Sequence, residues 1–189
     1  MTSAAPDEQP VREQAAREQA AREQGGRERL AALGCEVVDM AQGAYVVGTL
    51  GPVVIVCIGR DAGAAGHDAF SVANAQVARK HAKLAHLVLF GEGCTLPGVD
   101  ERQAVVEVLR SFQDQIVGAS MVLEGRGLMT VLLRSIVNVV DRINRSPHPT
   151  RMFPAAPEAA SWLVQTLDSG DAPSGAQLAD AVVALRRLL

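Results

Sequence analysis

The loop from Gly91 to Gly98 carries the side chains that are best placed for chemistry. It holds Glu92, Cys94 and Thr95 among glycines and ends before a predicted helix. A cysteine thiolate is a nucleophile, and nearby backbone N–H groups and a helix N-terminus would lower the pKa of Cys94. However, the sequence assigns no histidine to Cys94, and a free cysteine most often fills a small buried space. We therefore predict a binding loop with Glu92, Cys94 and Thr95, and no catalytic residue.

A second candidate loop, Gly125–Gly127, lies between a predicted strand and a predicted helix. Ligands of open α/β sheets collect at the carboxyl ends of strands, where helix N-termini attract anions. Arg126 is the candidate for holding an anion there, and the alternative is a solvated loop arginine. Together with Gly91–Thr95, this loop would form a cleft at the ends of the strands.

The histidines give no metal signature. His67, His81, His86 and His148 fall on different predicted elements, and no pair of metal-ligating residues has the usual spacing. His67 and Asp68 are adjacent, so on a helix their side chains point about 100° apart, and Asp68 is better interpreted as a charge at the helix N-terminus. We predict neither a metal ion nor a cofactor.

Short β-branched runs predict the strands that position these loops. Turn residues separate the first three runs, which indicates consecutive antiparallel strands. The run Val53–Ile58 has no polar alternation, which is typical of a central strand buried on both faces. The predicted strands are Cys35–Asp39, Ala44–Leu50, Val53–Ile58, Leu87–Phe90, Ser120–Glu124 and Thr150–Phe153.

Apolar residues at helical spacing predict helices between the later strands. The first such set is Phe70, Ala73, Val77 and Leu84, and the second is Val105, Val108, Leu109, Phe112 and Ile116. Asp100 and Gln103 resemble the N-cap pair of the second helix. Further helices are predicted over Leu128–Arg145 and, after Pro157, over Glu158–Leu167. This alternation predicts an α/β fold with crossover helices on a mixed, mostly parallel sheet.

Residues 1–29 form a charged arm before the predicted domain of residues 30–167. Its Arg-Glu-Gln segments repeat every five residues, which places Glu before Arg at i,i+4 but spreads the alanines around the helix. We interpret the arm as disordered at its start and then as a solvated helix. The alternative is an arm that docks on a partner.

Residues 168–189 are predicted to form a linker and an amphipathic C-terminal helix. Ser174 and Gln177 match a capping box before an apolar stripe. The apolar residues of Leu128–Arg145 cover about half of that helix, more than a surface helix normally buries. Either the C-terminal helix or a second subunit would cover this face, so a homodimer is one of two options.

Composition limits the remaining classes. The chain has 189 residues, 48% of them hydrophobic, which suffices for one domain with a real core. A net charge of −3 provides no positive field for nucleic acid. No signal peptide or membrane span is expected, and three cysteines without a paired framework fit a reducing compartment. We therefore predict a cytoplasmic protein.

The order of elements over residues 43–167 resembles the STAS fold, in particular its bacterial branch similar to anti-sigma-factor antagonists. The glycine-rich loop after a short strand and the ending Phe153 … Glu158-Ala159-Ala160-Ser161-Trp162-Leu163 carry the resemblance. It implies a regulatory or scaffolding module that binds a protein partner and has no enzymatic activity. Typical members carry a phosphorylatable serine in an Asp-Ser-Ser-Gly type segment, whereas this chain has Cys94 and Thr95 there. The alternative function is a small-ligand-binding protein or an enzyme that uses the cleft at Gly91–Thr95 and Gly125–Gly127.

Overall fold

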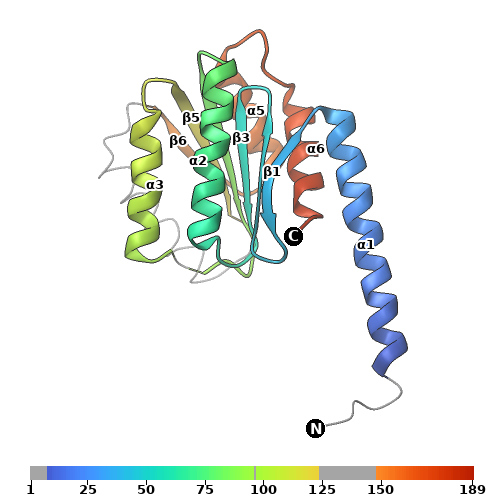
Figure 1. Ribbon diagram of the computed structural model, residues 1–189. Helices are drawn as coiled ribbons and strands as arrows, with labels where there is room; N and C mark the ends of the chain where they lie inside the picture. The colour runs from blue at the N-terminus through green and yellow to red at the C-terminus, as the bar shows by residue number, and fades with distance from the viewer. Residues whose placement is uncertain (1–7, 96, 124–147) are drawn as a thin grey trace.

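The computed structural model describes residues 8–95, 97–123 and 148–189, which form a mixed sheet covered on both faces by helices (Figure 1). Its six strands are β1 Glu36–Ala41, β2 Tyr45–Leu50, β3 Val53–Ile58, β4 Leu84–Phe90, β5 Ile116–Leu123 and β6 Thr150–Phe153. Their order in the sheet is their order in the chain. The β1–β2 and β2–β3 pairs are antiparallel, and the pairs from β3 to β6 are parallel. The predicted α/β fold with a mixed, mostly parallel sheet is therefore confirmed.

The helices divide between the two faces of the sheet. They are α1 Glu8–Leu33, α2 Gly63–Lys80, α3 Val99–Ser111, α5 Ala156–Leu167 and α6 Gly175–Arg186. Helices α2 and α3 cover one face, called here the front face, and α5 and α6 cover the back face (Figure 1). The predicted helix Leu128–Arg145 lies outside the described residues.

Strand β3 places apolar side chains on both faces of the sheet, so helices must pack on both. Val54 and Val56 are buried in the front cluster of apolar side chains, whereas Ile55 and Cys57 are buried in the back cluster. Successive side chains of a strand point to opposite faces, so a strand covered on both sides is apolar throughout. The prediction that Val53–Ile58 is a buried central strand is thus confirmed.

Two of the helices predicted from the sequence were too long at their C-terminal ends. Leu84 and Ile116 were assigned to helices, but they are the first residues of β4 and β5. Both side chains are buried in the front cluster with Phe70 of α2. An apolar residue that follows a helix can therefore continue its periodicity in the sequence while belonging to the next strand.

The expected cap of the second crossover helix was also wrong. Helix α3 begins at Val99, one residue before Asp100. The side-chain carboxylate of Glu101 accepts a hydrogen bond from the backbone N–H of Gly98 at 2.6 Å. The backbone N–H group before the helix therefore finds its hydrogen-bond acceptor in Glu101, and not in the predicted Asp100–Gln103 pair.

Helix α6 packs beside α5 on the back face (Figure 1). Its predicted capping box is confirmed, because Ser174 and Gln177 exchange hydrogen bonds of 2.9 and 3.1 Å between side chain and backbone. Leu185 is fully buried against β2, where a Cβ at Gly48 would lie 3.1 Å from the Cδ2 of Leu185. Glycine at this strand position lets the helix approach closely. Among the residues described, no helix combines the length and apolar character that a membrane crossing requires.

Helix α1 runs past the predicted boundary at residue 29 and contacts α6 near its end (Figure 1). Leu30 is buried in the back cluster, and Arg29 forms an ion pair with Asp180 of α6 at 2.5 Å. Gly26 is buried, and a Cβ there would lie 3.1 Å from the Cδ2 of Leu188. Earlier in the helix, Gln14, Gln19 and Gln24 hydrogen-bond to the carboxylates four residues on. The contact with the domain is thus concentrated in the last turns of α1.

Two changes test how much the start and the end of α1 each contribute to stability. Removing residues 1–20 should shift the thermal midpoint by less than about 2 °C, because Arg17 and Glu18 are exposed and exposed charged side chains contribute little to stability. Leu30→Ala should instead lower the free energy of unfolding by about 2–5 kcal/mol, since its buried side chain packs in the back cluster. Thermal unfolding followed by circular dichroism measures both, and a large fall for the truncation would contradict this division.

Candidate functional site

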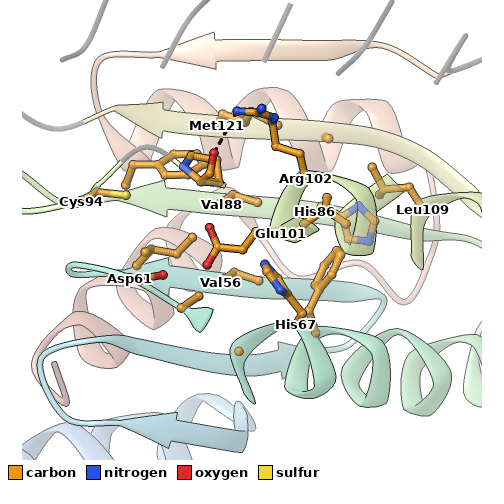
Figure 2. Close-up of a pocket in the computed structure, with 18 of the residues that line it drawn as sticks. Val56, Asp61, His67, His86, Val88, Cys94, Glu101, Arg102, Leu109 and Met121 are labelled. Atoms are coloured by element: carbon orange, nitrogen blue, oxygen red, sulfur yellow. Dashed lines mark hydrogen bonds between the residues drawn. The ribbon is translucent and has the colours of Figure 1, made fainter. Parts of the chain in front are cut away.

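A cavity of about 180 Å³ lies between the front face of the sheet, α2 and α3 (Figure 2). We call it the front cavity. Its floor includes Val56, Val88 and Met121, which are paired neighbours on β3, β4 and β5. Phe70 of α2 and Leu109 of α3 also line it. Strand pairing and two helices therefore place apolar side chains around a common space, as in many small-molecule sites.

His86 is the most buried polar side chain of this cavity, with 1% of its surface exposed. It lies two residues before Val88 on β4, so both side chains point to the front face. Its Nε2 lies 2.8 Å from the Oδ1 of Asn74, and the Nδ2 of Asn74 donates to the Phe70 carbonyl at 2.8 Å. Because Oδ1 can only accept, Nε2 carries the proton in neutral His86. The remaining ring nitrogen, Nδ1, is then an acceptor.

Burial determines the charge of His86. Removal from water and, as a smaller cause, the neighbouring His148 lower its pKa to about 3. The imidazole is therefore neutral at pH 7. A neutral histidine with one committed N–H group and one lone pair serves as a hydrogen-bond acceptor.

Charged side chains gather where the loops after β3 and β4 meet the start of α3. Asp61, Arg60, Glu101 and Arg102 all line the cavity, and Figure 2 places Asp61 and Glu101 on the same side as Cys94. Arg102 donates to the Pro97 carbonyl at 2.9 Å, and Arg60 donates to the Gly43 carbonyl at 3.2 Å. These contacts hold the loops in place, while the interior of the cavity is carbon-rich.

The predicted site residues separate into three groups. Cys94 and Thr95 line the front cavity, as Figure 2 shows for Cys94. Glu92 is exposed and is absent from the lining among the described residues. Arg126 and the loop Gly125–Gly127 lie outside the described residues. The structure thus brings two of the four predicted side chains to one cavity.

The environment of Cys94 raises the pKa of its thiol, whereas a nucleophilic cysteine requires a lowered pKa. Burial first, and then the carboxylates of Asp61 and Glu101, raise the pKa of its thiol to about 11. The Sγ donates to the Thr95 carbonyl at 3.3 Å. At pH 7 this residue is a neutral thiol, which makes it part of the wall rather than a reacting group.

Sequence reasoning missed that three histidines converge. His67 from α2, His86 from β4 and His148 before β6 all line the front cavity. One signal was available, because His86 interrupts the apolar run Leu84–Phe90, and a polar residue in a buried strand needs a partner. Within the ranges that the structure describes, no group of His, Cys, Asp and Glu side chains is arranged to hold a metal ion.

The fold and the site together define an α/β protein with an apolar front cavity that contains a buried neutral histidine. Comparison with known proteins gave no matching family model, no matching curated protein and no matching solved structure. The front cavity is therefore the feature of the molecule that bears on function.

Proposed function

We propose that this chain is a small-ligand-binding protein and that its ligand is a largely apolar molecule held in the front cavity. The observation that supports this proposal most directly is a cavity of about 180 Å³ with an apolar floor and a few polar groups at defined positions. Such a combination favours burial of carbon surface and leaves orientation to the polar contacts. The neutral thiol of Cys94 favours binding over covalent catalysis, because a cysteine nucleophile needs an activated thiolate.

Filling the cavity tests this proposal. Val88→Phe should weaken binding of the neutral fluorescent probe N-phenyl-1-naphthylamine by about tenfold, because the larger ring occupies the space of the probe. Val183→Phe is the matched control, since Val183 is 49% exposed on α6 at the back face. Saturable fluorescence enhancement measures affinity, and circular dichroism checks the fold of each variant. Equal affinity in wild type and Val88→Phe would contradict the proposal.

The STAS-like regulatory module is a second proposal. It is supported by the element order from β2 to α5, in which two antiparallel strands precede parallel strands joined by α2 and α3. In such a module, occupancy of the front cavity would alter the loops at Cys94 and Thr95 and thereby control a protein partner. The protein partner, the homodimer and the cytoplasmic location remain predictions from the sequence.

A further inference from the structure

A buried acceptor without a partner points to the chemistry of the ligand. The Nδ1 of His86 has no hydrogen-bond partner among the described residues, although the side chain is only 1% exposed. An unsatisfied buried polar atom costs roughly as much as a lost hydrogen bond, so native proteins rarely leave one unexplained. Figure 2 shows the imidazole beside the space enclosed by the other lining residues.

The hydrogen bond to Asn74 fixes the tautomer of His86. Asn74 is fully buried and is held by the Phe70 carbonyl, so its Oδ1 faces the Nε2–H of His86. Turning the amide around would set its Oδ1 against the Phe70 carbonyl oxygen, which places two acceptors together, and would turn its NH2 group toward the Nε2–H of His86. The Nδ1 therefore presents a lone pair, which receives a hydrogen-bond donor and repels an anion or a carbonyl oxygen.

The surroundings of this acceptor restrict the rest of the ligand. The Phe70 ring lies 5.1 Å from the imidazole ring, centroid to centroid, and Val54 and Ala119 are the strand neighbours of His86. These three neighbours offer carbon surface, and the polar side chain of these surroundings is His148, which lines the same cavity and acts on the charge of His86.

We propose that the ligand of the front cavity is a neutral, carbon-rich molecule whose hydroxyl or N–H group donates a hydrogen bond to His86 Nδ1. This inference rests on the proposed function and names the ligand class of the same site. It assigns His86 as the specificity-determining residue, with Asn74 as the residue that positions it.

Three probes of similar shape test the inference on the wild-type chain. 1-Naphthol has a hydroxyl donor, 1-methoxynaphthalene has an ether oxygen in the same place, and naphthalene has neither. The expected result from titration calorimetry is that 1-naphthol binds about five- to tenfold more tightly than the other two, as one net hydrogen bond predicts. Equal affinity for all three would overturn the donor inference and leave the proposed function supported. Binding of none of them would overturn both.

A spectroscopic readout locates the contact. In protein labelled with ¹⁵N-histidine, the Nδ1 resonance of His86 should shift on addition of 1-naphthol and remain in place with 1-methoxynaphthalene. The His86→Phe variant should bind both compounds with equal affinity, and the double variant His86→Phe, Asn74→Leu repeats this test without leaving the Asn74 amide buried and unpaired. A preference for 1-naphthol that persists in a folded variant, or a His86 resonance that ignores it, would overturn the assignment.

Discussion

Replacing Leu185 with alanine is expected to lower the free energy of unfolding by about 2–5 kcal/mol. Leu185 is fully buried on α6, in the apolar cluster of the back face. Removing its side chain takes away apolar contacts and leaves a space that Gly48, which has no side chain, cannot fill. Denaturant unfolding followed by circular dichroism measures the loss.

Val183 supplies the control on the same helix. It is 49% exposed, so Val183→Ala should change the free energy of unfolding by less than about 0.5 kcal/mol. Both substitutions alter the helix propensity slightly, but only Leu185→Ala opens the core. A similar small change in both variants would mean that α6 is not an integral layer of the domain.

Acid is expected to destabilise this protein through His86. The folded chain lowers the pKa of His86 from its ordinary value of 6.5 to about 3. Between these values the unfolded chain binds a proton that the folded chain does not, so stability falls as pH decreases. The contribution of His86 is about 1.4 kcal/mol per pH unit over most of this window, or about 3 kcal/mol between pH 6.5 and pH 4.

The measurement compares wild type with His86→Gln. Urea unfolding at several pH values between 7 and 4 gives the slope of stability against pH for each chain. The variant should be less stable at pH 7 but should have the shallower slope, because its side chain at position 86 does not titrate. Parallel slopes would show that residue 86 does not carry the acid sensitivity.

Periodicity and turn chemistry predicted most of the architecture. The continuous apolar run of Val53–Ile58 indicated a central strand, and the Ser174–Gln177 pair located the start of α6. These features succeed because they depend on neighbouring residues only. The assignment of Leu84 and Ile116 to helices was wrong because periodicity alone cannot separate the end of a helix from the start of a buried strand.

The candidate site was predicted only in part, because it is assembled from distant segments. Cys94 and Thr95 were expected near a ligand on the basis of their loop, and both line the front cavity. The convergence of His67, His86 and His148 depends on parallel pairing of strands and on the packing of α2, which no local pattern contains. The raised pKa of Cys94 has a related origin, since it comes first from burial and then from Asp61, which lies far from Cys94 in the sequence.

The contact between α1 and α6 bears on the order in which this chain can fold during synthesis. Leu30 near the end of α1 and Leu188 just after α6 are buried in one cluster, and the backbone N–H of Gly43 donates to the Leu189 carbonyl at 2.9 Å. The ribosome produces α6 after every strand of the sheet, so the back faces of β2 and β3 stay exposed to water until α6 has left the exit tunnel. Exposed apolar strands are prone to aggregate in this interval. Nascent chains stalled before α6 should therefore be the species that general chaperones hold, whereas the front layer of α2 and α3 can assemble earlier.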